Sequence, residues 1–316
     1  MSLGLVWFRR DLRVRDNEAL AAAQRCFDRV LPVYVWDPRE WGDSRYGFCR
    51  TGVYRTRFLV ESLADLREHL LQLGGNLLVI EGFPEVVLPD LAIRHGAAGL
   101  FAGKEVGWEE GQVECRLVDA LGGLCPVQWF RGQTLLHPED LPFEVKSLPG
   151  VFTSFRRRVE SEWVVREELP VPKEVPWPEG VECFWQGLER YGAGEVMADA
   201  RAALRFRGGE SAGLDRLDSW FWAGDCLRSY KETRNGLVGA DYSSKFSPWL
   251  AMGCLSPRTA YFEIRRYEAE RAKNDSTYWL IFELLWRDYF RFLAEKVGRR
   301  LFLAGGLKGE AVGIGQ

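Results

Sequence analysis

Short apolar runs alternate with longer amphipathic stretches through the first 130 residues, and this pattern constrains the fold more than any other feature. The apolar runs are rich in Val, Leu and aromatic residues, which is typical of buried strands. The predicted strands are 3–8, 30–36, 76–80, 99–102 and 127–130, and the predicted helices between them are 17–25, 54–73, 84–95 and 109–121. This alternation predicts a parallel sheet with right-handed crossovers, and therefore a doubly wound, Rossmann-like α/β domain.

The loop after the first predicted strand indicates what this domain does not bind. It begins at Arg9 and reads Arg-Arg-Asp-Leu-Arg, without the glycine pattern of a dinucleotide-binding turn. Ligands of open α/β sheets nevertheless bind at the carboxyl ends of the strands. Glu105 follows the fourth predicted strand, so we expect it at that edge.

The pattern changes after residue 131. Seven prolines punctuate residues 132–194, interrupted by one predicted helix at 151–162, which is typical of a connection that wraps the surface. From residue 195 the period is helical, with predicted helices at 195–206, 212–222, 258–273 and 278–297. The sequence therefore predicts an α/β domain over 1–131, a linker over 132–194 and an all-helical domain over 195–316.

Composition excludes several classes of protein. The net charge is −3, so no global basic field indicates a protein that coats DNA, although a local basic groove remains possible. The chain contains no apolar run of about 18 residues, and charges at Arg9 and Arg10 come too early for a secretory signal. The seven cysteines show no paired metal-ligand spacing, which argues against a zinc site or a disulfide framework. These features predict a cytoplasmic protein without a membrane span.

Residues 241–248 read Asp-Tyr-Ser-Ser-Lys-Phe-Ser-Pro and form a candidate anion site. Serine hydroxyls and backbone N–H groups at the start of a helix offer convergent donors, and Lys245 adds a positive charge. This set of donors suits a phosphate or a diphosphate. The alternative is an ordinary helix start, because Ser followed by Pro commonly begins a helix.

The helix predicted at 278–297 carries a second candidate. Glu283, Trp286, Arg287 and Phe290 are spaced at i, i+3, i+4 and i+7 and therefore share one face. A carboxylate, an indole and a guanidinium beside another aromatic ring can hydrogen-bond and stack on a flat heterocycle. The alternative is a core helix with a Glu283–Arg287 surface pair, which would contribute only a few tenths of a kcal/mol.

Together these segments resemble the photolyase/cryptochrome family, and most closely its DASH-type cryptochromes. The resemblance spans nearly the whole chain in the family's order. In the first half of the chain, the matching motifs are the first strand and loop at 6–17, the second strand at 31–39 and the linker segments 140–143 and 151–153. In the helical part, they are Tyr-Lys-Glu-Thr-Arg-Asn-Gly-Leu at 230–237, Leu-Ser-Pro-Arg at 255–258, and Asn-Asp-Ser-Thr-Tyr-Trp at 274–279, which leads into 283–290.

The resemblance implies an FAD-binding protein with an antenna. Glu283 and Arg287 match positions that line the flavin pocket. Glu105 matches the carboxylate that holds a folate antenna, 5,10-methenyltetrahydrofolate. The positions that match the loop around the FAD diphosphate are Tyr230, Ser243, Ser244, Lys245, Phe246 and Ser247.

The activity implied by the resemblance is light-driven DNA repair by a carbon–carbon lyase. Excited reduced flavin passes an electron to a cyclobutane pyrimidine dimer, the ring opens and the electron returns. Glu283 would hydrogen-bond the flipped dimer and Trp286 would stack on it. DASH-type members are associated with dimers in single-stranded DNA, and we expect a monomer. The expected DNA contacts are Arg234, Glu283, Trp286, Arg287 and Phe290.

Chains of this family continue well past the helix that carries Trp286. The sequence is therefore expected to lack the carboxyl-terminal part of the flavin pocket, as a fragment, an early stop or a frameshift would produce. Two alternatives to a repair enzyme follow from the resemblance. One is a non-catalytic binding module without stable FAD, and the other is a blue-light signalling photoreceptor.

Overall fold

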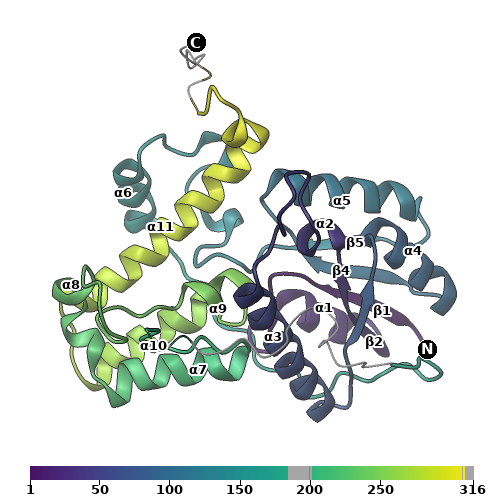
Figure 1. The fold of residues 1–316 in the computed structure, drawn as a ribbon, viewed down its shortest axis with the longest axis horizontal. Helices are drawn as coiled ribbons and strands as arrows, with labels where there is room; N and C mark the ends of the chain where they lie inside the picture. Colours follow the sequence, from purple (N-terminus) through teal and green to yellow (C-terminus); the bar gives the residue numbers. More distant parts are fainter. Residues whose placement is uncertain (184–198, 200, 308, 310–316) are drawn as a thin grey trace.

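Five parallel strands form a single sheet among the residues that the structure, a computed structural model, describes: 1–183, 199, 201–307 and 309 (Figure 1). The strands are β1 (Leu3–Phe8), β2 (Arg29–Trp36), β3 (Leu78–Glu81), β4 (Gly99–Gly103) and β5 (Val127–Phe130). Their order is β3-β2-β1-β4-β5, and every neighbouring pair is parallel. The predicted doubly wound domain is confirmed.

Helices cover both faces of the sheet because alternate side chains of each strand point to opposite faces. Val6 and Phe8 of β1 belong to the apolar cluster with α1 (Glu18–Cys26) and α3 (Val53–Gln72). Leu5 and Trp7 belong to the cluster on the other face, which includes α4 (Pro84–His95) and α5 (Trp108–Leu121). Burial on both faces explains why the strands read as continuous apolar runs.

The predicted strands and helices of this domain agree with the structure to within two residues at each end. One helix was not predicted, α2 (Pro38–Trp41). It has four residues and follows β2 directly, and the Asp37 side chain caps it by accepting a hydrogen bond from the Arg39 amide at 2.9 Å. A single turn of this kind shows no hydrophobic period in the sequence.

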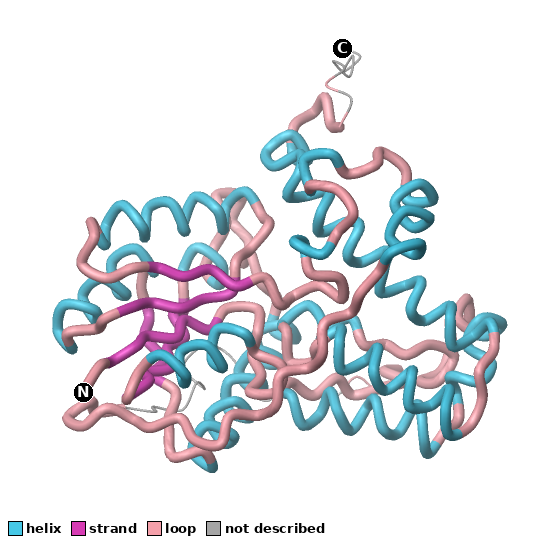
Figure 2. Tube along the Cα trace, turned by 180° about the vertical axis from the view of Figure 1, so that it is seen from behind, coloured by secondary structure: helices cyan, strands magenta, loops and turns pink. Residues whose placement is uncertain are grey.

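The linker is more deeply buried than predicted. It contains the 3-10 turns Pro138–Asp140 and Val145–Ser147 and the helix α6 (Phe152–Glu162), whose buried residues pack against α11 (Asp275–Val297). Leu135, Leu136 and Phe155 are fully buried, so the prediction of a surface wrap is wrong for this part. The segment after α6 runs back along the α/β domain, where the Val175 amide bonds the Leu73 carbonyl at 2.8 Å (Figure 2).

The carboxyl-terminal region is helical, as predicted. Its elements are α7 (Glu210–Asp218), a π turn (Ser219–Ala223), a 3-10 turn (Cys226–Ser229), α8 (Tyr230–Thr233), α9 (Ser247–Met252), α10 (Pro257–Glu270), α11 and a 3-10 turn (Gly298–Phe302). No helix among the described residues is long and apolar enough to cross a membrane.

The helix predicted at 195–206 is wrong where it can be compared. Residues 195–198 and 200 lie outside the described residues, and 201–206 contain a turn at 201 and a bend at 203–204 but no helix. Asp199 accepts hydrogen bonds from both the amide and the guanidinium of Arg201, at 2.9 Å each to Oδ1. Such local side-chain bonds compete with the helical backbone pattern.

The α/β domain and the carboxyl-terminal helical region share one apolar core. The cluster that contains α1 and α3 continues without a break through Trp220 and Phe221 to Leu285 and Phe292 of α11. The division at residues 131 and 194 therefore stays a prediction.

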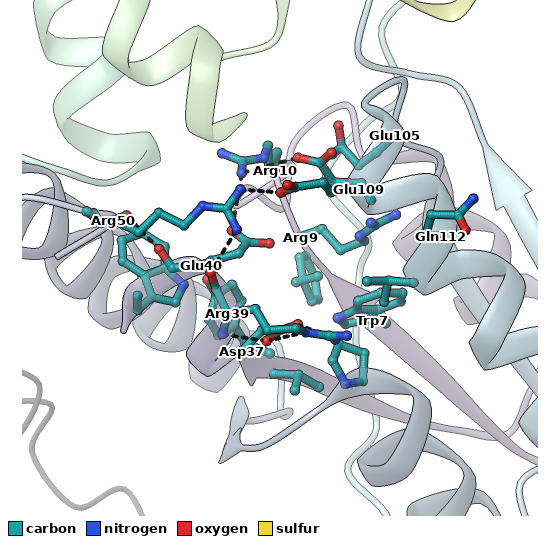
Figure 3. A pocket seen from close by; sticks show the side chains of 18 of the residues that line it. Trp7, Arg9, Arg10, Asp37, Arg39, Glu40, Arg50, Glu105, Glu109 and Gln112 are labelled. Atoms are coloured by element: carbon teal, nitrogen blue, oxygen red, sulfur yellow. Dashed lines mark hydrogen bonds and ion pairs between the residues drawn. The ribbon is translucent and has the colours of Figure 1, made fainter. Parts of the chain in front are cut away.

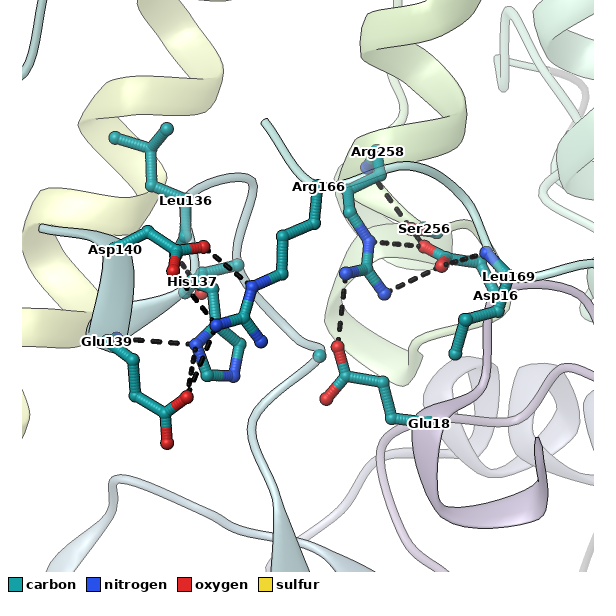
Figure 4. Close-up of polar contacts among 12 residues, drawn as sticks. Asp16, Glu18, Leu136, His137, Glu139, Asp140, Arg166, Leu169, Ser256 and Arg258 are labelled. Carbon is teal, nitrogen blue, oxygen red and sulfur yellow. Dashed lines mark hydrogen bonds and ion pairs between the residues drawn. The ribbon is translucent and has the colours of Figure 1, made fainter. Parts of the chain in front are cut away.

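A buried ion pair also joins the two regions (Figure 4). Asp16, in the loop before α1, accepts hydrogen bonds from Arg258 of α10, with Oδ1–Nη2 at 2.6 Å and Oδ2–Nε at 2.9 Å. Ser256 donates to the same carboxylate, and Glu18 lies 3.1 Å from Arg258 Nη1. The charges of this pair are almost fully excluded from water, with side-chain exposures of 0% and 3%.

Gly253, which ends α9, brings the helical region against the loop after β1. Its backbone has φ of +69°, and a Cβ there would lie 1.9 Å from the carbonyl oxygen of Arg10. We expect Gly253→Ala to lower the free energy of unfolding through left-handed strain and this backbone clash. Gly96 also ends a helix, with φ of +61°, but a Cβ there would meet no atom within 4 Å. Gly96→Ala therefore measures the cost of the left-handed backbone alone.

In urea unfolding, Gly253→Ala is expected to cost about 1–3 kcal/mol more than Gly96→Ala, which is the usual cost of overpacking. Equal losses in the two variants would show that the close approach of Gly253 and Arg10 does not hold the regions together.

His69 of α3 gives stability a dependence on pH. Its Nδ1 lies 3.4 Å from the buried carboxylate of Glu210 at the start of α7, and its Nε2 lies 3.1 Å from Ser211 Oγ. The interaction with Glu210 raises the pKa of His69 above its ordinary value, against the opposing effect of burial, and Asp65 and Glu68 add to it. Protonated His69 therefore stabilises the folded state.

That stabilisation is fully present below the ordinary histidine pKa of about 6.5 and is lost as the pH rises through the raised value. The difference in free energy of unfolding between the unaltered chain and His69→Gln should shrink from pH 6 to pH 9. Parallel pH profiles of the two proteins would contradict this assignment.

Candidate functional site

Helix α11 presents the predicted face. Asn274 caps the helix, with Oδ1 accepting hydrogen bonds from the amides of Ser276 and Thr277 at 2.9 and 3.1 Å. Glu283, Trp286, Arg287 and Phe290 follow at helical spacing on one side. Phe290 is the most exposed of these, at 57%.

Glu283 pairs with Arg234, and the predicted alternative of a Glu283–Arg287 pair is wrong. Arg234 Nη1 lies 3.5 Å from Glu283 Oε1, and the Arg234 guanidinium also lies 4.8 Å from the centre of the Trp279 ring. Tyr230 is buried nearby, and burial together with the Glu283 charge raises its pKa to about 12. The structure thus brings together Tyr230, Arg234 and Glu283 from α8, its carboxyl-terminal end and α11.

Trp286 lies in an aromatic stack. Its ring is nearly parallel to Phe152 of α6, with ring centres 3.6 Å apart and an interplanar angle of 12°. Phe290 stacks on it less closely, at 5.4 Å and 23°. Phe152 was not predicted as a site residue. Because it is almost completely buried, Phe152 fixes the orientation of the indole.

Arg287 is held by backbone carbonyls. It donates to the Gln133 carbonyl at 2.7 Å and to the Leu250 carbonyl of α9 at 3.1 Å. Burial, and next the charge of Arg291, lower the pKa of Arg287 to about 10. The guanidinium therefore stays charged at neutral pH and connects α11 to α9 and to the linker.

The loop that leads into α9 carries the predicted anion donors. Phe246 is buried against Trp220 and Phe221 and anchors the loop. Lys245 has a left-handed backbone with φ of +56°, and its Nζ lies 3.7 Å from the Tyr242 ring centre. Helix α9 has only six residues, so its dipole adds little. Any anion here would depend on the loop itself.

The donors of this loop fit a diphosphate. Within the described part of the chain, the hydroxyls of Ser243, Ser244 and Ser247 make no hydrogen bond, and Lys245 makes no ion pair. The nearest carboxylate in the loop, Asp241, is paired with Arg216 at 3.0 Å. Three hydroxyls without a hydrogen-bond partner, and one ammonium group whose contact is the Tyr242 ring and not a carboxylate, are therefore available to an anionic ligand.

A cavity of about 560 Å³ opens at the carboxyl ends of β1, β2 and β4 (Figure 3). Aromatic rings and arginines line it together with several carboxylates, and Arg50 pairs with Glu109 at its edge. The principal labelled side chains are Trp7, Arg9, Arg10, Asp37, Arg39, Glu40, Arg50, Glu105, Glu109 and Gln112. Glu105 lies at this edge, as expected, and a ligand in the cavity stays a prediction.

Glu105 lines this cavity and also contacts α11. Its Oε1 accepts a hydrogen bond from Gln133 Nε2 at 2.8 Å, and its Oε2 lies 3.5 Å from Arg291 Nη2. Burial acts to raise the pKa of Glu105, but the charges of Arg291 and Arg9 and the Gln133 bond outweigh it and hold the pKa below its ordinary value. A negative charge is therefore kept at the cavity wall.

Several residues of these sites are not among the predicted site residues. Gln133 and Arg291 connect the cavity wall to α11, but neither belongs to a motif. Phe152 belongs to the segment 151–153 that carries part of the family resemblance, and Arg216 lies in the helix predicted at 212–222, but neither is a predicted site residue. A spacing pattern reports which face a residue occupies, and it does not report the partner on another element.

Comparisons with known proteins agree with this architecture. The family model described as DNA photolyase matches residues 4–175. A protein of Gloeobacter violaceus named cryptochrome DASH is 50% identical over 307 residues, which cover 96% of this chain and 61% of its own length. The crystal structure of the Synechocystis cryptochrome matches with a TM-score of 0.93 at 48% identity, over 97% of this chain and 64% of that one.

A bacterial class III photolyase from Agrobacterium tumefaciens shares the fold, with a TM-score of 0.77 at 23% identity. It is matched over 95% of this chain and 60% of its own. The chain thus spans less than two thirds of the length of each of these relatives.

Proposed function

This chain belongs to the DNA photolyase family, and from that premise we propose that it binds FAD and supports blue-light-driven electron transfer to cyclobutane pyrimidine dimers in DNA. The observation that carries the proposal is the loop at 243–247. Its free hydroxyls and Lys245 lead directly into α9, whose Leu250 carbonyl binds Arg287. The donors for a diphosphate and the polar face of α11 are therefore adjacent.

The residues of the loop would hold the cofactor. Ser243, Ser244 and Ser247 would donate to the diphosphate, and Lys245 would balance its charge. The Tyr230 phenol, with its pKa raised to about 12, stays protonated at neutral pH and can donate a hydrogen bond. When bound, reduced FAD supplies the photoexcited electron.

The face of α11 would hold the substrate. The Glu283 carboxylate would accept hydrogen bonds from the dimer, and Trp286, kept in place by Phe152, would stack on it. Arg234, Arg287 and Phe290 would contact the strand around the flipped bases. A low net charge and a local set of arginines fit single-stranded DNA better than a duplex.

We also propose an antenna site in the α/β cavity. Trp108, at 43% exposure, offers flat apolar surface for a pterin ring, whereas Trp7 is buried under the Arg9 guanidinium, 4.3 Å from its ring centre. The charged Glu105 carboxylate can accept hydrogen bonds from the amino groups of the pterin. Arginines on the wall suit the acidic tail of 5,10-methenyltetrahydrofolate. In equilibrium dialysis, Glu105→Gln should weaken folate binding and leave FAD binding unchanged.

The experiment that tests the proposed function starts with the purified chain. Equilibrium dialysis measures whether it retains FAD. Dimer-containing oligothymidylate, single-stranded or annealed, is then illuminated with blue light under reducing conditions and analysed by chromatography for restored thymidine. We expect retained FAD and light-dependent repair, faster on the single strand.

Two outcomes would count against this function. A chain that retains no FAD would favour a binding module without flavin. FAD retention without repair of either oligonucleotide would favour a signalling photoreceptor. Sedimentation of the FAD-bound chain tests the predicted monomer, and a cytoplasmic location stays a prediction.

A further inference from the structure

Among the described residues, the Arg216 side chain of α7 donates all of its hydrogen bonds to a single short loop. Its side chain is 8% exposed. Nε donates to the Ser244 carbonyl at 3.1 Å, and Nη2 donates to the carbonyls of Ala240 and Ser243 at 2.9 and 3.2 Å. Nη1 pairs with the Asp241 carboxylate at 3.0 Å. One buried guanidinium therefore binds four acceptors within five consecutive residues.

Two further side chains complete this set of bonds. Trp220 Nε1 donates to the Asp241 carbonyl at 3.0 Å, and Thr233 Oγ1 donates to the Tyr242 carbonyl at 2.9 Å. All five successive carbonyls from residue 240 to residue 244 thus accept a hydrogen bond from the body of the helical region.

The orientation of the carbonyls fixes the orientation of the amides. Across a trans peptide, the carbonyl of one residue and the N–H of the next point in opposite directions. The amides of residues 241, 244 and 245 therefore point away from Arg216, and the amides of residues 242 and 243 point away from Trp220 and Thr233. None of these amides donates a hydrogen bond within the described residues. Successive outward amides that include a left-handed residue, here Lys245, form a concave site for an anion.

Arg216 also changes the electrostatics of the loop. The Asp241 carboxylate is the acidic group closest in sequence to the serines and would repel a diphosphate. Pairing with the buried Arg216 cation neutralises it. The same side chain thus orients the amide donors and removes the nearest opposing charge.

We propose that Arg216 is a positioning residue for diphosphate recognition, which preorganises the amides of residues 241, 244 and 245, beside those held through Trp220 and Thr233, without contacting the ligand. This inference rests on the proposed FAD-binding function. It predicts that Arg216 matters for ligands that carry a diphosphate and not for the neutral part of the flavin.

The test compares three probes, FAD, ADP and riboflavin, by equilibrium dialysis against the unaltered chain, Arg216→Lys and Arg216→Gln. Lysine keeps the charge but lacks the planar fork that reaches several carbonyls at once. We expect both variants to bind FAD and ADP about 10- to 100-fold more weakly, because hydrogen bonds to charged groups contribute at that level. Arg216→Gln should show the larger loss of affinity. Riboflavin binding should change less than twofold.

Arg258→Lys is the matched control, because Arg258 is equally buried and ion-paired but lies in α10, where it binds Asp16. It should lower the melting temperature without changing the affinity for ADP. Thr233→Val removes one carbonyl donor and leaves Arg216 in place, so a smaller loss, a few fold for FAD and ADP, tests the same idea in a milder variant.

Each result bears on the proposal. Unchanged FAD and ADP affinity in the Arg216 variants, or an equal loss for riboflavin, would overturn the positioning role while leaving the proposed function intact. If the unaltered chain binds neither FAD nor ADP, the proposed function is contradicted and the assignment of Arg216 falls with it.

Discussion

Replacing Glu283 by alanine is expected to weaken binding of a dimer-containing single strand by about 10- to 150-fold, the loss of about 1.5–3 kcal/mol that follows removal of a hydrogen bond to a charged group. The carboxylate lies on the α11 face beside Trp286, where its partner among the described residues is Arg234. Affinity for the undamaged strand should change little, because that strand presents no flipped dimer. Fluorescence anisotropy with the two oligonucleotides measures the ratio and does not require bound flavin.

Glu295→Ala is the matched control for this measurement. Glu295 lies on the same helix and is also ion-paired, with Arg131, but it is three turns further along. It should leave the preference for damaged DNA intact. If Glu283→Ala retains the preference of the unaltered chain, Glu283 does not recognise the dimer. If both strands weaken equally, it acts through general structure or charge.

The second large effect concerns stability. Asp16→Ala is expected to lower the free energy of unfolding by about 3–5 kcal/mol, because it leaves the charge of Arg258 buried without its main partner. Asp16 also accepts hydrogen bonds from Ser256 and from the Leu169 amide, so two segments, the start of α10 and the chain around Leu169, lose a common acceptor. Urea unfolding followed by circular dichroism measures the loss.

Asp140→Ala provides a control with the same chemistry and a different environment. Asp140 binds Arg166 through two hydrogen bonds, at 2.6 and 2.9 Å, which resemble those between Asp16 and Arg258 (Figure 4). This pair is partly exposed to water, with side-chain exposures of 38% and 27%, so its loss should cost about 1 kcal/mol or less. Similar losses in the two variants would contradict the role given to burial.

The double variant Asp16→Ala/Arg258→Met separates the charge from the packing. Removing both partners leaves no unpaired charge, so the double variant should be more stable than Asp16→Ala alone. A double variant that is less stable than either single variant would show that the hydrogen bonds, and not the buried charge, dominate the cost.

Much of the fold could be predicted because its signals are local. The strand β1 is buried on both faces and so reads as one continuous apolar run. The long helix α11 has a clear period, which also placed Glu283, Trp286 and Arg287 on one face. These features depend on residues that are close in sequence, and they need no knowledge of the partner element.

The failed predictions have two different causes. Residues 201–206 have helical composition, but Asp199 binds the Arg201 amide two residues away and the segment is not helical. The linker has the prolines of a surface connection, yet Leu135 and Phe155 are buried because α11 lies where they can pack. In both cases a contact that the pattern does not encode decided the outcome.

The sequence by itself determined the parallel α/β sheet, the helical region after it and the chemical types of the candidate donors on α11 and in the serine loop. Only the tertiary structure decided that Glu283 pairs with Arg234, that Phe152 stacks on Trp286, and that Arg216 binds backbone carbonyls of the serine loop. The physical reason is the distance in sequence between the residues that interact. Periodicity arises from burial along one element, whereas each of these contacts joins residues 28 to 134 positions apart whose meeting depends on how the elements pack.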